Sequence, residues 1–69
     1  MERIETRTSS MFKEISYQDG YLKLYFINGT VYQYRDVPKQ MWDRMKNAAS
    51  TGSFYNTYIK PTYQFVRLI

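Results

Sequence analysis

Aromatic and basic side chains alternate along one short stretch of this chain. Tyr21, Lys23 and Tyr25 are spaced two residues apart, and Arg35 follows on the next segment. Residues two apart in a strand point to the same face, where rings can stack on nucleobases and cations attract phosphates. A second group of the same chemistry is predicted near the C-terminus of the following helix: Arg44, Ser50, Tyr55, Asn56 and Lys60. We predict that these two groups bind nucleic acid or a nucleotide, although tyrosine and lysine also alternate on ordinary half-exposed strands.

Catalytic and metal chemistry find little support in the composition. The chain has no cysteine and no histidine, so a metal ion would depend on carboxylates alone. No serine, threonine, lysine or carboxylate is paired with a base at an informative spacing. The three glycines, Gly20, Gly29 and Gly52, are typical of turns or caps and form no phosphate-binding loop. We therefore expect no enzyme activity, no metal site and no cofactor.

Length and charge limit the class of protein. A chain of 69 residues makes one domain, and such a chain buries only about 60% of its unfolded surface. Without disulfides, its stability must come from aromatic packing or from self-association, which makes a homo-oligomer possible. The net charge of +4 is compatible with a phosphate-bearing partner or simply with solubility. No apolar stretch is long enough to span a membrane and no signal peptide opens the chain, so we expect a cytoplasmic protein.

The rest of the fold is organised around the stretch Tyr21–Tyr34, which reads as a β-hairpin turning at Asn28-Gly29. A two-residue loop would pair Phe26 with Val31. It would place Tyr32 and Tyr34 on the face of the sheet away from Leu22 and Leu24. A three-residue loop would instead pair Leu24 with Tyr32 and Leu22 with Tyr34, with Gly29 in a left-handed conformation. We favour the three-residue loop because it gives one continuous apolar face. In that register, Tyr32 and Tyr34 hold the fold, and the predicted binding residues occupy the other face.

Before this hairpin, residues 1–8 are predicted to form a flexible or weakly extended N-terminal arm, and residues 9–69 a single domain. Ser9-Ser10 are expected in a turn. Met11–Tyr17 has the alternation of a first strand, and Asp19-Gly20 provides a second hairpin turn.

After the hairpin, Lys39–Ala49 is predicted to be helical, because Met41 and Met45 lie one turn apart with Trp42 beside them. Asp36 is a candidate for its N-terminal cap and Gly52 for its C-terminal cap. Phe54–Ile59 is expected to be one helical turn or irregular, and Tyr63–Ile69 to be β-prone, free to join the sheet or another copy. The predicted fold class is α+β: a three-stranded antiparallel meander with one helix packed on one face, plus a C-terminal aromatic segment that can add a further strand.

The order of these features resembles the KTSC domain, a small domain found at the C-terminus of some lysyl-tRNA synthetases and alone in bacterial and phage proteins. The matching positions run from about Ser9 to Arg67: Ser9-Ser10, Tyr17, Leu22, Leu24, Phe26, Asn28-Gly29, Tyr32, Tyr34, Val37-Pro38, Ala49-Ser50, Gly52, Phe54–Asn56, Ile59 and Tyr63. Each element is common by itself, and the ordered set gives the match its weight. The chain departs from the family pattern at Lys60-Pro61. The resemblance implies no established activity. The occurrence of the domain in lysyl-tRNA synthetases suggests RNA binding, by analogy only.

Three functions remain open. The first is a module that binds RNA or single-stranded nucleic acid through an aromatic and basic sheet face. The second is a small oligomer, of the kind a phage might use, that sequesters a signalling nucleotide between subunits. The third is a protein-protein interaction module that uses the C-terminal strand or exposed aromatic residues.

Overall fold

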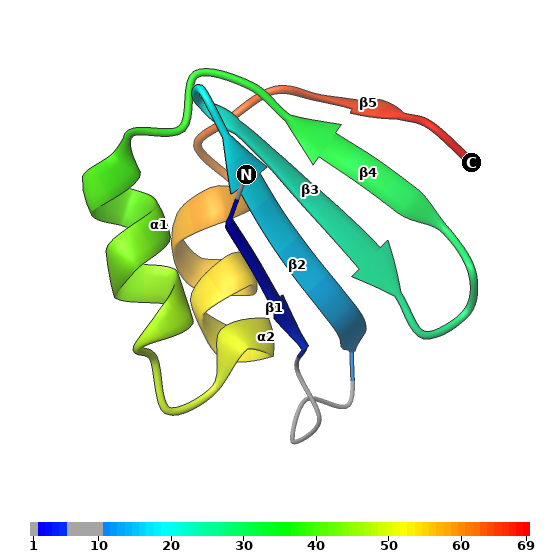
Figure 1. Ribbon diagram of the computed structural model, residues 1–69, viewed down its shortest axis with the longest axis horizontal. Coiled ribbons are helices and arrows are strands. Elements are labelled where there is room, and N and C mark those ends of the chain that lie inside the picture. The colour runs from blue at the N-terminus through cyan, green and yellow to red at the C-terminus, as the bar shows by residue number, and fades with distance from the viewer. Residues whose placement is uncertain (1, 6–10) are drawn as a thin grey trace.

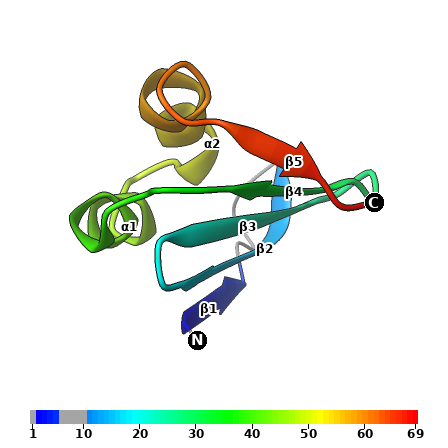
Figure 2. The same cartoon turned by 90° about the horizontal axis from the view of Figure 1, so that it is seen from above.

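The computed structural model describes the backbone of residues 2–5 and all atoms of residues 11–69. In this part of the chain, one antiparallel sheet contains five strands in the order β1-β2-β3-β4-β5, and the helices lie against one of its faces (Figures 1 and 2). The elements in chain order are β1 (Glu2–Glu5), β2 (Phe12–Gln18), β3 (Tyr21–Phe26), β4 (Val31–Tyr34), α1 (Lys39–Lys46), α2 (Thr51–Phe54), the π-helical turn η1 (Tyr55–Ile59) and β5 (Phe65–Arg67). The predicted α+β class is confirmed, with a larger sheet than the predicted meander.

The β3–β4 hairpin has the three-residue loop that the sequence favours. Leu24 lies opposite Tyr32 and Leu22 opposite Tyr34. The Gly29 N–H donates to the Phe26 carbonyl oxygen at 3.0 Å, and Gly29 has a φ of 94°. A left-handed residue at the third loop position is the signature of a turn followed by a G1 bulge. The loop therefore fixes which tyrosines face the core.

The β2–β3 hairpin turns at Asp19-Gly20, as predicted. Gln18 lies opposite Tyr21, and both loop residues have positive φ, 51° for Asp19 and 86° for Gly20. Two residues of positive φ form the turn that matches the right-handed twist of the flanking strands. The pairing shifts by one residue between Phe12 and Glu14, which marks a bulge at the start of β2.

The N-terminal segment differs from its prediction. Instead of a flexible or weakly extended arm, Glu2–Glu5 forms β1 and pairs antiparallel with β2, where Ile4 lies opposite Ile15. This pairing satisfies backbone groups along an edge of β2 that would otherwise be open. The remainder of the predicted arm and the expected turn at Ser9-Ser10 lie outside the described residues.

At the other edge of the sheet, β5 pairs antiparallel with β4. Phe65 lies opposite Tyr34, and Arg67 lies opposite Tyr32. The predicted C-terminal strand is thus present, and it joins the sheet of its own chain.

Helix α1 begins after Pro38, as expected of a residue that lacks an N–H. The prediction that Asp36 caps this helix is wrong. Pro38 occupies the N-cap position without a side-chain hydrogen bond, and Asp36 has a φ of 58° in the turn before it. This left-handed conformation, which Asp tolerates better than most residues, redirects the chain from the sheet to the helix. The helix also ends at Lys46, before the predicted Ala49.

The predicted cap at Gly52 is also wrong, because Gly52 lies inside α2 and is buried. Ser50 is the N-cap of α2 and accepts a hydrogen bond from the Ser53 N–H at 3.2 Å. The helix continues without a break into η1, where the Lys60 N–H donates to the Tyr55 carbonyl oxygen at 2.9 Å. The segment expected to be one turn or irregular is therefore helical throughout.

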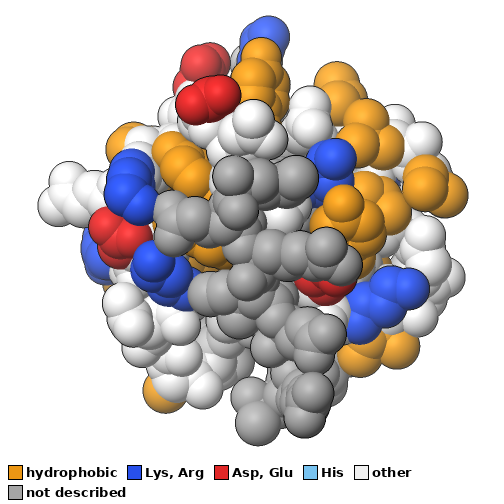
Figure 3. Space-filling model, viewed as in Figure 1, with side chains coloured by type: hydrophobic (Ala, Val, Ile, Leu, Met, Phe, Trp, Pro, Cys, Tyr) orange, Lys and Arg blue, Asp and Glu red, His pale blue; other side chains and the backbone are white. Residues whose placement is uncertain are grey.

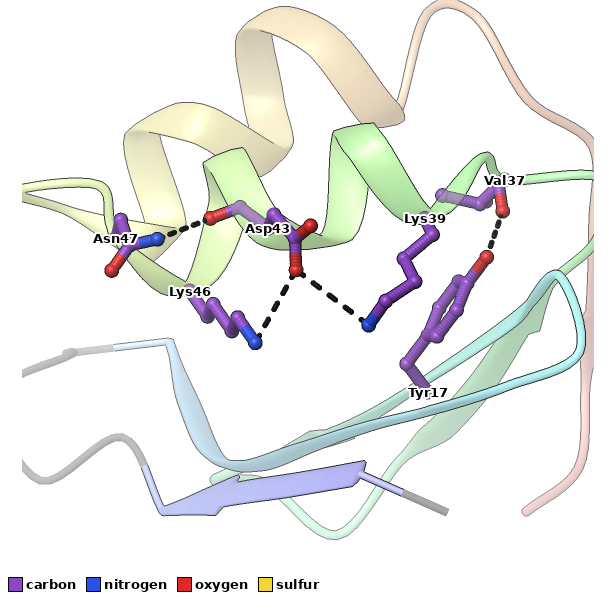
Figure 4. Close-up of polar contacts among 6 residues, drawn as sticks. All are labelled: Tyr17, Val37, Lys39, Asp43, Lys46 and Asn47. Atoms are coloured by element: carbon purple, nitrogen blue, oxygen red, sulfur yellow. Dashed lines mark hydrogen bonds and ion pairs between the residues drawn. The ribbon is translucent and has the colours of Figure 1, made fainter.

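The core lies between the sheet and the helices. Its fully buried side chains include Trp42 and Met45 of α1, and the Trp42 indole stacks on Tyr17 with ring centroids 5.4 Å apart. The Tyr17 hydroxyl donates to the Val37 carbonyl oxygen at 2.6 Å, which ties β2 to the start of α1 (Figure 4). Within α1, Asp43 forms ion pairs with Lys39 and Lys46 (Figure 4). Among the described residues, no helix has the length and apolar character needed to cross a membrane.

Candidate functional site

One hollow of the described surface is a groove between the β3–β4 hairpin, β5 and η1. Its volume is about 430 Å³, within the range of small-molecule sites, about 300–1,000 Å³. We call it the aromatic groove. It is lined by Met11, Phe26, Asn28, Thr30, Tyr32, Tyr34, Tyr55, Asn56, Lys60 and Phe65.

Packed rings form the wall of the aromatic groove. Tyr32 and Phe65 stack with centroids 4.6 Å apart and an interplanar angle of 24°. Phe26 meets Tyr32 edge-to-face at 5.1 Å. The Phe65 side chain remains 47% exposed, and Tyr32 is half-buried. Accessible, fixed aromatic faces are suited to stacking with a planar ligand.

Two tyrosine hydroxyls meet at the base of the groove. The Tyr34 and Tyr55 hydroxyl oxygens are 2.7 Å apart, so one hydroxyl donates to the other, and both residues are buried. Burial, followed by this hydrogen bond, raises the pKa of Tyr34 far above its usual range. Burial also raises the pKa of Tyr55. Both hydroxyls are therefore neutral at physiological pH and add no negative charge to the groove.

The rim of the groove is polar and carries one cation. The Asn28 Oδ1 accepts a hydrogen bond from the Thr30 N–H at 3.0 Å, which orients the Asn28 amide. Asn56 and Lys60 extend from η1 and its C-cap, and both side chains are exposed. Lys60 forms no ion pair with the described residues, and none of the lining residues is acidic. A π-helical turn at this position fits the frequent occurrence of such turns at functional sites.

The groove brings together three of the residues predicted from the sequence. Tyr55, Asn56 and Lys60 all line it. Tyr55 is only 4% exposed, and its ring packs edge-to-face against Phe12 at 5.4 Å, so it contributes to the core as well.

Arg44 and Ser50, which were grouped with them, do not line the groove. The Arg44 guanidinium lies 4.9 Å from the centroid of the Tyr58 ring, on the helical side of the molecule. The Ser50 hydroxyl is engaged as the cap of α2. These contacts give both residues structural roles.

The other predicted group lies on the face of the sheet opposite the helices, here called the outer face. Lys23 lies opposite Gln33, and that row continues to Ser16 and Val66. Tyr21 and Lys23 line one shallow hollow of about 400 Å³. Tyr21 and Arg35 line a second hollow of about 390 Å³.

Tyr25, which was predicted with them, is half-buried and lines neither outer hollow. Its neighbours across the strands are Glu14 and Val31. Tyr21 therefore connects Lys23 and Arg35 through the two outer hollows, whereas Tyr25, two residues beyond Lys23 on β3, lines neither.

Sequence reasoning missed Tyr32, Phe65 and Asn28 as groove residues. The sequence favours packing for Tyr32, with its hydroxyl at the rim, and a turn for Asn28. A signal for Phe65 did exist, because pairing of the last strand with β4 would place it on the same face as Tyr34. No local sequence pattern predicts that η1 packs against the hairpin and forms one side of the groove.

The model of the KTSC domain family matches residues 8–63. A KTSC domain protein from Yersinia pestis has a similar crystal structure, with a TM-score of 0.87 and 27% sequence identity over 99% of this chain and 97% of that one.

Two relatives are similar in sequence. A lysine–tRNA ligase of Nostoc punctiforme is 34% identical over 61 residues, which are 86% of this chain and 11% of that enzyme. A protein of Tsukamurella paurometabola is 40% identical over 47 residues, which are 68% of this chain and 70% of that protein. The chain therefore spans only a small part of the ligase and most of the second relative.

Proposed function

The chain belongs to the KTSC domain family, and we propose that it is a non-catalytic module that binds nucleic acid, above all RNA, or a nucleotide. A base would occupy the aromatic groove. The observation that carries this proposal is the combination, in one groove, of stacked aromatic rings with a cation that forms no ion pair, and with no acidic side chain, among the described residues.

The chemistry of the groove favours a base joined to a phosphate. A base stacked on an aromatic side chain gains about 1–3 kcal/mol, and Phe65 offers the most accessible ring. Lys60, on the rim, suits the phosphate. The amides of Asn28 and Asn56 can donate and accept hydrogen bonds, as recognition of a base edge requires.

The same groups argue against catalysis. The titratable side chains of the groove are Lys60 and three tyrosines. Because the pKa values of Tyr34 and Tyr55 are raised, their hydroxyls are poor sources of a nucleophile or a general base. We therefore propose binding without turnover.

Two further observations support RNA over other ligands. One relative is named a lysine–tRNA ligase, an enzyme that acts with an RNA. The chain also carries a net charge of +4, which favours a polyanion. On the same grounds we propose that the protein acts in the cytoplasm. Sequestration of a free signalling nucleotide is the alternative within this class.

The proposal is tested by fluorescence anisotropy with labelled single-stranded RNA, and by calorimetry with unlabelled mono-, di- and cyclic nucleotides. Phe65→Leu keeps an apolar side chain but removes the stacking face, so affinity should fall by about 5- to 150-fold, the equivalent of about 1–3 kcal/mol. Lys60→Met should weaken binding and, if Lys60 neutralises one phosphate, reduce the salt slope by about 0.7.

The matched control is Lys39→Met, which makes the same change of charge on α1, away from the groove. Lys39 takes part in an exposed ion pair with Asp43, and such pairs contribute little to stability. If Lys39→Met weakened binding as much as Lys60→Met, attraction would be non-specific. Absence of binding to every RNA and nucleotide would refute the proposal.

A second candidate function is self-association or protein binding through β5. Apolar side chains are exposed in and just after this edge strand: Val66 is 56%, Leu68 46% and Ile69 71% exposed. An edge strand with apolar side chains can pair with another chain. Light scattering across a range of concentrations tests the homo-oligomer, and Val66→Lys should dissociate it. A monomer at all concentrations would refute self-association.

A further inference from the structure

The aromatic groove and the two hollows of the outer face border one another along β5. Phe65 lines both the groove and one outer hollow. Tyr21 and Gln33 line both outer hollows. The groove lies on the helix-covered face, where Phe65 lies opposite Tyr34, and the outer hollows lie on the other face. The three hollows therefore form a series that begins in the groove, passes around the β5 edge at Phe65 and continues over the outer face. We call the two outer hollows together the outer track.

The outer track repeats the chemistry of the groove. Tyr21 is 50% exposed, and Lys23 forms no ion pair with the described residues. The Arg35 Nη2 donates to the Gln64 Oε1 at 2.6 Å, which holds the exposed guanidinium where the chain enters β5. Aromatic faces interleaved with cations are the usual track for a single strand.

The charges along the outer track favour the end next to the groove. Arg35 lies in the hollow that shares Phe65 with the groove. The carboxylate that lines the track belongs to Asp19, in the far hollow beside Tyr21 and Lys23. On the side of the molecule away from α1, hydrophobic side chains lie next to those of Lys or Arg (Figure 3). A phosphate chain leaving the groove would therefore meet Arg35 first, then Lys23.

We propose that the ligand is a single strand of several nucleotides, which starts in the aromatic groove, crosses Phe65 and continues along the outer track. This inference rests on the proposed function and chooses between its two forms. A free nucleotide would fill only the groove and leave Tyr21, Lys23 and Arg35 unused. A strand uses the whole series, as in small single-strand-binding domains that cover about 4–16 nucleotides.

The test compares oligonucleotides of increasing length. A mononucleotide and single strands of two, four and eight residues, each as RNA and as DNA, are titrated into the full chain. Affinity should rise with length up to the strands that reach Lys23. The double substitution Lys23→Met with Arg35→Met should lower the affinity for the eight-residue strand by about tenfold or more, and its salt slope by about 1.4. The same variant should bind the mononucleotide unchanged, whereas Lys60→Met should weaken every ligand.

The control variant combines Lys13→Met with Lys39→Met, which removes the same charge at positions that line none of the three hollows. Thermal unfolding of each variant verifies that it is folded. If the eight-residue strand bound no tighter than the mononucleotide, or if the control and outer-track variants lost affinity equally, this inference would be overturned. The proposed function would survive that result as long as Lys60→Met still weakened the mononucleotide. Tighter binding of the RNA than of the DNA with the matching sequence would show that the site prefers ribose.

Discussion

Replacing Tyr34 by Phe removes one hydroxyl from the buried Tyr34–Tyr55 pair and leaves both rings in place. The two oxygens are 2.7 Å apart, and the rings pack edge-to-face with centroids 5.7 Å apart. Because Phe has nearly the same shape as Tyr without the hydroxyl, the packing should be retained. The substitution therefore isolates the hydrogen bond.

Its cost follows from the burial of the pair. A typical hydrogen bond contributes about 0.5–1.5 kcal/mol, and a buried partner left unsatisfied costs about 1–3 kcal/mol. Tyr55 would be left in that position in Tyr34→Phe. Since both residues also line the aromatic groove, water can reach the remaining hydroxyl and reduce the penalty. We expect a loss of about 1–2 kcal/mol in the free energy of unfolding, or about 4–16 °C in Tm for a domain of this size.

Urea unfolding followed by the fluorescence of Trp42, the single tryptophan, measures this loss. The double variant Tyr34→Phe with Tyr55→Phe leaves no orphaned hydroxyl, so it should lose less than the sum of the two single variants. Additive losses, or a Tyr34→Phe variant as stable as the parent, would refute the hydrogen-bonded pair as a stabilising unit.

Three further predictions test the fold. Burial raises the pKa of Tyr34 and of Tyr55 in the folded protein. Their contribution to stability should therefore be fully present below about pH 10, where unfolded tyrosines also keep their protons. Above that pH it should fall by about 1.4 kcal/mol per pH unit for each tyrosine, and Tyr34→Phe should halve the slope measured by urea unfolding. Gly29→Ala should cost about 1–2 kcal/mol in stability because Gly29 has a positive φ. Gly52→Ala in α2 should instead be neutral or stabilising by up to about 1 kcal/mol, since a Cβ would meet Met11 at an ordinary 3.7 Å. Equal effects of the two substitutions on Tm would contradict this. Ser50→Ala should cost about 0.5–2 kcal/mol through the lost cap of α2, and an unchanged Tm would argue against that cap.

Local chemistry was enough to predict both hairpins and the start of α1. Asp19, Gly20 and Gly29 have the positive φ that these turns need, and Pro38 fits the beginning of a helix. At Asn28-Gly29 the apolar alternation also selected the register, because a shift by one residue would move Tyr32 and Tyr34 to the face away from Leu22 and Leu24. The caps were less predictable. Asp is one of the residue types that commonly cap helices, but Asp36 is a turn residue in the left-handed conformation.

The site was predictable only in part. The sequence identified Tyr55, Asn56 and Lys60, and it identified Tyr21, Lys23 and Arg35 as a separate group. It gave no means of bringing the two groups together, because their relation depends on where β5 lies. It also favoured packing for Tyr32, with only the hydroxyl at the rim, although the Tyr32 ring lines the groove.

By itself, the sequence determined the family, the α+β class and the face on which each tyrosine of the central hairpin lies. These properties follow from turns and from alternation over a few residues. The tertiary structure alone decided the groove, because pairing of β5 with β4 carries Phe65 across to Tyr34, and η1 carries Lys60 to the same place. Contacts between residues so far apart in the chain depend on how whole elements pack, which no local pattern specifies.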